Sequence, residues 1–199
     1  LKAYLPKTPL FIKPTKIVKT NYSLGLDYFG FTPKDPYPVA VQLNDRPFAN
    51  VFIINATTES YLKKNKIKVM AALKLGLIGP LSGGEFVHKT IHKATGNRFP
   101  RGWDNQIKND LLLSYEASLT KHFKLVDNLL EIEAFFEVEV GTYKVRQLLG
   151  GTLKAGKLNS FEALAQDQKM NEYYLFLSPR ISRVYFDATL QGGIIKRDS

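Results

Sequence analysis

The chain has 199 residues, 44% of them hydrophobic, which is enough for a domain with its own core and excludes a disordered or collagen-like polymer. Lys and Arg number 28 against 18 Asp and Glu, and the net charge of +10 favours an anionic partner: nucleic acid, anionic lipid or a phosphorylated glycolipid. The absence of cysteine excludes disulfides, thiolate zinc sites and thiol nucleophiles.

Alternation of apolar and polar residues with a period of two is the dominant pattern, and this period indicates β-strands. In chain order, we expect strands over residues 20–31, 48–58, 66–78, 110–119, 130–140, 143–155, 173–178 and 182–191. The clearest is 130–140, where Leu130, Ile132 and Ala134 alternate with glutamates. Apolar runs such as residues 51–54 are far shorter than the roughly 20 residues of a transmembrane helix, and residues 1–19 lack the apolar core of a signal peptide.

Most of these strands are long, which suits two architectures. One is an antiparallel sheet in a soluble protein with one face in water. The other is a transmembrane β-barrel, whose strands cross the bilayer with about 9–11 residues. Aromatic residues near many strand ends fit the interfacial girdle of a barrel, but they are also ordinary strand formers. The alternation alone leaves both architectures open.

Four glutamates share one face of the 130–140 strand. A pair of carboxylates is the catalytic device of glycoside hydrolases. We favour instead a polar barrel lumen, in which the glutamates pair with inward lysines such as Lys66, Lys68 or Lys74. The four residues are Glu131, Glu133, Glu137 and Glu139.

Residues 79–106 break the strand pattern and are too long for a hairpin loop. Ser82 followed by Glu85 has the spacing of a capping box, and Gly96 is a helix-stop signal, so a short helix is predicted between them. Structured insertions of this length in an all-β chain are usually functional.

The predicted helix carries His88 and His92 one turn apart, with Glu85 three residues before His88. Such a pair can bind a metal ion, and a histidine beside a carboxylate can act as a general base. The alternative is two solvated histidines on a surface helix. Trp103, the only tryptophan, is either a hydrophobic anchor for the loop or the wall of a pocket.

Four cations crowd the same insertion, namely Lys89, Lys93, Arg98 and Arg101. Arginine can hold phosphate in a fork geometry that lysine cannot match, so a phosphorylated lipid is one interpretation. A basic loop that is merely solvated is the other. No nucleic acid partner is expected, because no recognised nucleic-acid-binding module accompanies the positive charge.

Three motifs carry a family resemblance. The first is Gly79-Pro80-x-Ser82-Gly83-Gly84-Glu85, followed by His92, Gly96 and the segment from Pro100 to Gln106. The others are Phe31-Thr32-Pro33-Lys34-Asp35 and Asp45-Arg46-Pro47-Phe48-Ala49, in the expected order. Together they resemble the lipid A 3'-O-deacylase family of outer-membrane proteins.

The resemblance implies an all-β fold: a twelve-stranded antiparallel transmembrane barrel in the outer membrane of a Gram-negative bacterium. Residues 1–199 would form one barrel domain, with one short helix in the insertion 79–106, which would carry the active site. The sequence accounts for about eight strands, so closure would need residues outside it.

The implied activity is a calcium-dependent esterase that removes the 3'-linked acyloxyacyl chain of lipid A in lipopolysaccharide. His92 matches the catalytic histidine that activates water, and calcium would stabilise the oxyanion. His88 and Glu85 would assist His92. Trp103, Arg98, Arg101, Lys89 and Lys93 would bind the substrate. The metal ligands are not identified.

The chain departs from the family pattern at informative places. His88 stands where the family has Gln, and Arg98-Phe99 stand where it has an acidic residue of the calcium site. The family's Asn-Asp pair and active-site Thr would precede Leu1. The alternative function is therefore a catalytically silent outer-membrane barrel, acting structurally or with protein partners in a larger membrane complex.

Overall fold

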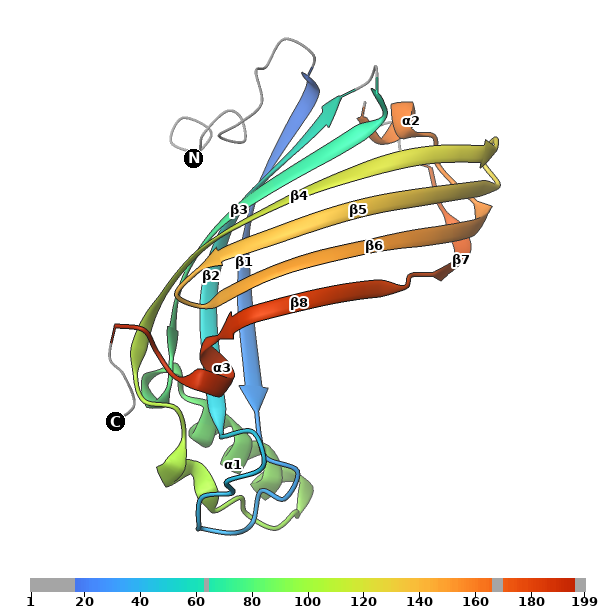
Figure 1. Cartoon of the computed structure of the whole chain (residues 1–199). Helices are drawn as coiled ribbons and strands as arrows, with labels where there is room; N and C mark the ends of the chain where they lie inside the picture. The colour runs from blue at the N-terminus through green and yellow to red at the C-terminus, as the bar shows by residue number, and fades with distance from the viewer. Residues whose placement is uncertain (1–16, 63–64, 166–169, 196–199) are drawn as a thin grey trace.

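The computed structural model describes residues 17–62, 65–165 and 170–195. They form a single curled antiparallel sheet, with loops and short helices gathered at its ends (Figure 1). The strands are β1 (Ile17–Phe31), β2 (Ala49–Leu62), β3 (Ile67–Ile78), β4 (Asp110–Val126), β5 (Leu130–Gly141), β6 (Lys144–Lys157), β7 (Tyr173–Leu177) and β8 (Arg180–Asp187). The expected all-β antiparallel fold is confirmed.

Strands that follow one another in sequence lie side by side from β1 to β6. Both β7 and β8 pair with β6: Tyr173–Leu177 lies against its C-terminal end and Arg180–Asp187 against its N-terminal part. The two are in effect one strand interrupted at Pro179, which has no N–H to donate. Within the described residues β1 does not pair with β7 or β8, so this part of the chain is an open half-barrel.

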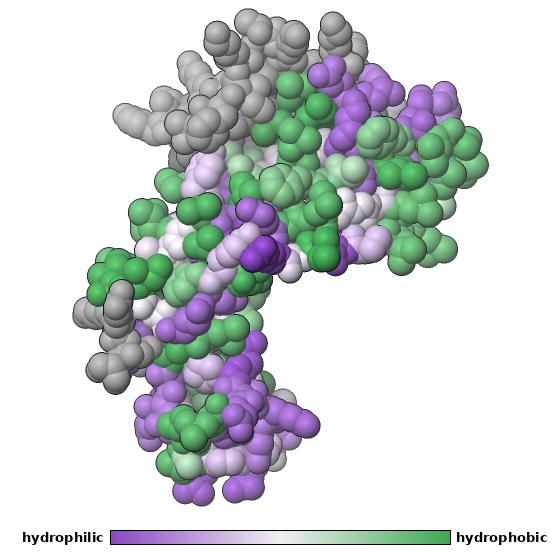
Figure 2. Space-filling model, in the orientation of Figure 1, coloured by the Kyte–Doolittle hydropathy of each residue, from purple (hydrophilic) through white to green (hydrophobic). Residues whose placement is uncertain are grey.

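The two faces of the sheet are the reverse of those in a soluble protein. One face carries a row of paired apolar residues that crosses β1 to β4. They are Leu26, Ile54, Leu75 and Leu113, which are 70%, 46%, 58% and 54% exposed. The opposite face buries charged side chains instead, with Glu139 only 2% exposed. Figure 2 shows hydrophobic side chains gathered over the strands. Apolar outside and polar inside is the pattern of a transmembrane barrel and decides against the soluble sheet.

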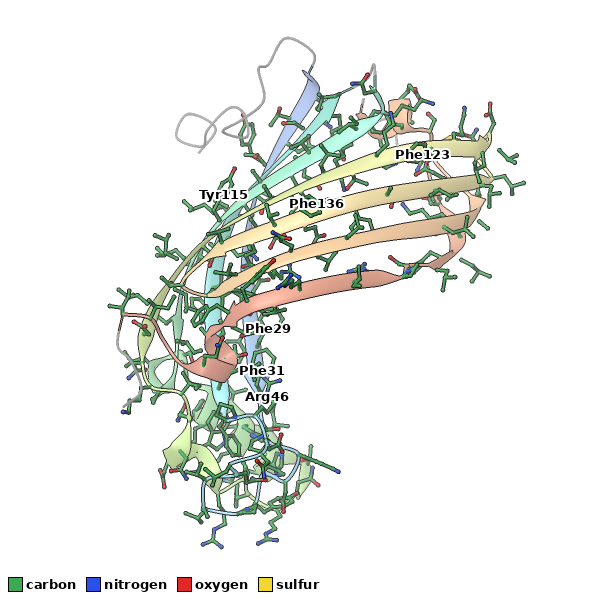
Figure 3. All side chains as sticks on the ribbon, in the orientation of Figure 1. Phe29, Phe31, Arg46, Tyr115, Phe123 and Phe136 are labelled. Atoms are coloured by element: carbon green, nitrogen blue, oxygen red, sulfur yellow. The ribbon has the colours of Figure 1, made fainter. Side chains whose placement is uncertain are left out.

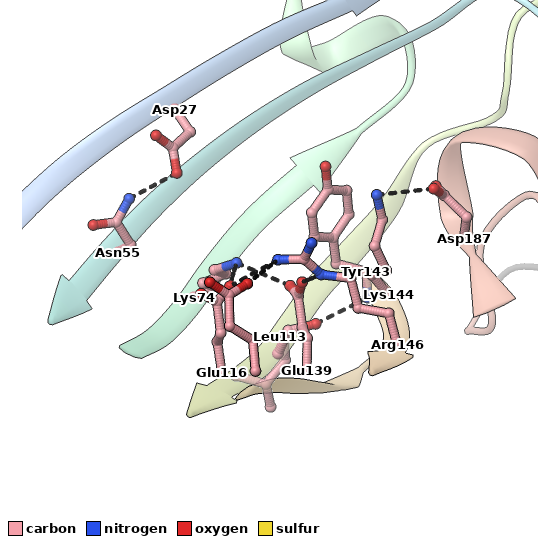
Figure 4. A network of polar contacts seen from close by, with 12 residues as sticks. Asp27, Asn55, Lys74, Leu113, Glu116, Glu139, Tyr143, Lys144, Arg146 and Asp187 are labelled. Carbon is pink, nitrogen blue, oxygen red and sulfur yellow. Dashed lines mark hydrogen bonds and ion pairs between the residues drawn. The ribbon is translucent and has the colours of Figure 1, made fainter. Parts of the chain in front are cut away.

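The inward glutamates are held by cations (Figure 4). Lys74 pairs with both Glu116 and Glu139, and its Nζ lies 3.0 Å from Glu139. Arg146 reaches Glu137 and Glu139 at 3.6 and 3.1 Å. Of the lysines expected to pair with the β5 glutamates, only Lys74 does so. Lys66 and Lys68 instead pair with Glu162 and Glu59. At their end of the sheet Glu131 and Glu133 are held by His122 and Lys154. The carboxylates thus line the lumen as ion pairs.

The insertion between β3 and β4 folds into three short helical pieces: η3 (Pro80–Ser82), α1 (Gly84–Thr95) and η4 (Gly102–Asn105). The expected stop at Gly96 is confirmed, with a left-handed φ of 70°. The expected Ser82 cap is wrong. Its hydroxyl is engaged with the Asn50 and Gly79 carbonyls, and Gly83 precedes the helix in a left-handed conformation.

Two further helices were not expected. Residues 188–191, predicted as strand, form α3 (Ala188–Gln191), because the Asp187 carboxylate accepts a hydrogen bond from the Thr189 N–H and caps a helical turn. The other is α2 (Phe161–Ala165), which packs Phe161 on Tyr61. No helix in the described ranges is long and apolar enough to cross a membrane.

Candidate functional site

His88 and His92 face each other on α1. Their Nε2 atoms are 2.9 Å apart, and their rings are nearly perpendicular, at 84°. The Nδ1 of His92 lies 2.5 Å from the carbonyl oxygen of Arg98, which can only accept a hydrogen bond. His92 therefore carries its proton on Nδ1 and a lone pair on Nε2. It follows that His88 donates its Nε2–H to that lone pair.

Burial lowers the pKa of His88 below its ordinary value, and the neighbouring His92 lowers it further. His88 is therefore neutral at pH 7. A neutral imidazole is the form that can accept a proton or bind a metal ion.

A cavity of about 310 Å³ lies beside His88. It is walled by the end of β1 and the residues after it, by the start of β2, by α1 and by η4. The lining residues are Tyr28, Gly30, Thr32, Asn50, Gly84, Val87, His88, Ile91 and Trp103. Most of this lining is apolar, whereas His88 and Asn50 contribute polar groups. The cavity can thus accept an apolar chain beside a polar reacting group.

The sequence folds this way locally because α1 approaches β2 very closely. Asn50 donates from Nδ2 to the Ser82 hydroxyl at 2.8 Å and to the Ser82 carbonyl at 3.0 Å. A Cβ at Gly84 would lie only 2.3 Å from the Asn50 Cβ, so glycine is required there. Trp103, 2% exposed, packs on Phe48 at 4.7 Å and meets the His88 ring edge-on at 5.8 Å.

The other expected site residues are distributed around the pair. The Glu85 carboxylate accepts from Lys89 Nζ at 2.5 Å and contacts neither histidine. The Arg98 guanidinium lies over the Tyr37 ring at 4.7 Å. Lys89 and Arg101 line one open depression of about 590 Å³, together with Val39, Phe99, Pro100 and Asp104. Lys93 is exposed and lines neither hollow.

The two upstream motifs, residues 31–35 and 45–49, are joined by a hydrogen bond and a cation–π contact. The Asp45 carboxylate accepts hydrogen bonds from the backbone N–H groups of Lys34 and Arg46, at 2.6 and 2.7 Å, and these two bonds lower its pKa. The Arg46 guanidinium lies 4.1 Å from the centre of the Phe31 ring (Figure 3). The motifs therefore shape the 32–48 loop that leads into β2.

Sequence reasoning missed Tyr28, Thr32 and Asn50 as cavity residues. Asn50 had a signal, because it directly follows the Asp45–Ala49 motif. Thr32 had one too, because it lies within the Phe31–Asp35 motif, whereas Tyr28 had none beyond its place at the end of a strand. Tyr37, the partner of Arg98, was not singled out either.

The residues described around His92 do not fit calcium, which takes six to eight oxygen ligands. On α1 the one carboxylate, Glu85, is paired with Lys89, and Arg98 stands nearby. In the described part of the chain, the only group of three side chains spaced to hold a metal is His122, Glu131 and Glu133. It lies far along β4 and β5, toward the other end of the sheet.

An apolar outer face, a lumen of ion pairs and a histidine site at one end define an outer-membrane β-barrel protein with a candidate active site. The chain belongs to the family described as outer membrane protein LpxR, whose model matches residues 2–199. The resemblance noted in the three motifs and the expected outer-membrane location are thereby confirmed.

Among solved structures, the fold is similar to that of LpxR from Salmonella typhimurium, with a TM-score of 0.77 and 19% sequence identity. The similarity covers 88% of this chain and 64% of that one, so the chain spans a little under two thirds of its structural relative. No curated protein matches the sequence.

Proposed function

We propose that the protein is an ester hydrolase of the outer membrane that removes the 3'-linked acyloxyacyl chain of lipid A. Membership of the LpxR family supports this class of substrate. The observation that carries the proposal is the orientation of His92. The Arg98 carbonyl fixes its Nδ1–H, which leaves the Nε2 lone pair beside His88 and the cavity.

In this mechanism His92 Nε2 accepts a proton from water while the water oxygen attacks the ester carbonyl carbon. The Arg98 carbonyl stabilises the imidazolium that forms, because it accepts from Nδ1–H throughout. The tetrahedral intermediate then collapses, and His92 returns the proton to the departing sugar oxygen. His88 occupies the lone pair in the resting state and must yield this position to the attacking water.

The surroundings suit an amphipathic anion. Val87, Ile91 and Trp103 give the cavity an apolar wall for an acyl chain. Leu81 and Phe86, 72% and 75% exposed, extend the apolar surface toward lipid. Lys89 and Arg101, which share the second depression, are placed to meet phosphate groups of lipid A or lipopolysaccharide.

Family resemblance implies calcium as the cofactor, but the residues described around His92 do not supply its ligands. The mechanism above therefore contains no calcium step. Carboxylates from residues outside the described chain would have to complete a calcium site.

Mass spectrometry of lipid A incubated with the full-length protein, with and without calcium, tests the proposal. We expect loss of one acyloxyacyl unit, and we expect His92→Ala to abolish it. Thr90→Ala, on the same helix, is the matched control, because Thr90 is exposed and its hydroxyl donates to the Phe86 carbonyl of the same helix. Unaltered lipid A with the wild-type protein under both conditions would refute hydrolysis.

The second candidate is a catalytically silent barrel that acts structurally or with protein partners in a membrane complex. Two observations favour it: His88 fills the lone pair that a general base needs, and no carboxylate of the described residues contacts His92. Unaltered lipid A in the experiment above is the result this candidate expects.

A further inference from the structure

We propose that His88 and His92 form a chelating site for a divalent transition-metal ion, with copper(II) the best-fitting ion and nickel(II) next. The proposal does not depend on ester hydrolysis. It concerns nitrogen ligands and a soft-to-intermediate cation, and is separate from calcium, which prefers oxygen.

The spacing of the two nitrogens selects the geometry. Each imidazole nitrogen sits about 2.0–2.1 Å from a bound metal ion. Two nitrogens 2.9 Å apart then subtend an angle of about 90° at the ion, which is the cis angle of square-planar and octahedral sites. A tetrahedral zinc site would need them about 3.3 Å apart. Copper(II) and nickel(II) therefore fit without movement of the helix.

The tautomers also fit a metal site. His92 has a lone pair on Nε2, 2.9 Å from the His88 Nε2, and its Nδ1–H is bonded to a backbone carbonyl. This outer hydrogen bond is the usual way in which proteins orient a metal-binding histidine. His88 needs only to move its proton from Nε2 to Nδ1, so two neutral rings bind the ion with no net release of protons.

The local charge permits a cation. Lys89 is paired with Glu85, and the Arg98 guanidinium lies over the Tyr37 ring. Lys93 is exposed, where salt screens its charge. The Trp103 ring stands edge-on to His88 and limits its rotation. Water can complete the coordination shell from the open side of the helix.

Copper(II) titration of the full-length protein in detergent, stripped of metal and carrying no histidine tag, tests the site. We expect one ion per chain by calorimetry, and electron paramagnetic resonance should show nitrogen coupling from two equatorial imidazoles. His88→Gln and His92→Gln should each weaken binding on the order of a hundredfold, since each removes the chelate.

The chain has three histidines, and His122→Gln is the control that separates the pair from the His122 cluster. Its binding should be unchanged. Heat-modifiable migration on gels checks that each variant is folded, and Thr90→Ala controls for changes to α1. Absence of saturable binding, a spectrum with one nitrogen, or wild-type affinity in His88→Gln would overturn the proposal. Hydrolysis is not used as a readout, so failure of the proposed function leaves this result standing.

Discussion

The molecule contains two histidine clusters, and they differ in what remains available to bind. His122 is 5% exposed, and its Nδ1 lies 2.9 Å from Glu131 and 3.5 Å from Glu133. Lys154 neutralises Glu133, and Phe161 covers the His122 ring. His88 and His92 are partly exposed, hold each other and a backbone carbonyl, and adjoin a cavity. The first cluster is enclosed in the sheet, where Glu131 and Glu133 hold the His122 Nδ1 and no described residue reaches its buried Nε2, whereas the second adjoins a cavity that a ligand can enter.

The strongest test of this contrast is His122→Ala. It leaves Glu131 and Glu133 without their shared partner in a buried setting, which should cost about 3–5 kcal/mol of unfolding free energy. Urea unfolding in detergent measures the loss. Hydrolysis by the folded fraction should be unchanged, because the site lies elsewhere. A variant as stable as the wild type would remove the distinction between the clusters.

Gly84→Val addresses the packing that creates the cavity. The new side chain would collide with Asn50, which should lower the unfolding free energy by about 1–3 kcal/mol and push α1 away from β2. Gly83→Asn is the matched control. The space around Gly83 is open, and Asn tolerates its left-handed φ of 77°. Equal losses for both variants would show that backbone strain, not contact with Asn50, is the cause.

A smaller effect is expected on lipid A binding, and it should differ among the basic residues of the insertion. Replacing Lys89 and Arg101 with Gln should weaken binding of bisphosphorylated lipid A about tenfold, since both charges face one depression. Dephosphorylated lipid A should bind equally well to the wild-type protein and to the double variant. Arg98→Gln should have less effect, because Arg98 is stacked on Tyr37. Equal losses for the two lipids in a vesicle-binding assay would contradict a phosphate site.

The smallest predicted effect is a pH dependence of stability. The pKa of His88 is lower in the folded protein than in the unfolded chain, so the unfolded chain binds more protons between the two values. Stability from this group is full above pH 6.5 and decreases as the pH falls toward the folded pKa. Unfolding curves from pH 7.5 to 5 should show this slope reduced in His88→Gln and retained in Thr90→Ala.

The sheet was largely predictable from sequence, because the period-two alternation is a local signal that the membrane and the lumen both impose. Leu130–Gly141 shows this most plainly. The prediction was less accurate at strand ends, where the alternation weakens. The strand β4 continues beyond residue 119 to Val126. The last predicted strand ends in a helical turn, because Asp187 caps it at Thr189. Capping by one carboxylate is worth about 1 kcal/mol, enough to decide four residues.

The site was predictable only in part. The one-turn spacing of His88 and His92 follows from helical geometry. The Arg98 carbonyl beneath His92 depends on the turn that follows α1. The Tyr37 ring beneath Arg98 and the Asn50 wall come from contacts between distant segments. Ser82 was misassigned for the same reason, since Asn50, thirty-two residues away, competes for its hydroxyl. The burial of His122 against Glu131 likewise comes from a residue of the neighbouring strand.

The contacts between the 31–35 and 45–49 motifs bear on how members of this family are recognised from sequence. Lys34 with Asp45, and Arg46 with Phe31, fasten the 32–48 loop. A match to these two motifs therefore detects residues that hold a loop in place. Substitutions on α1 would leave these contacts, and so the match to the two motifs, unchanged.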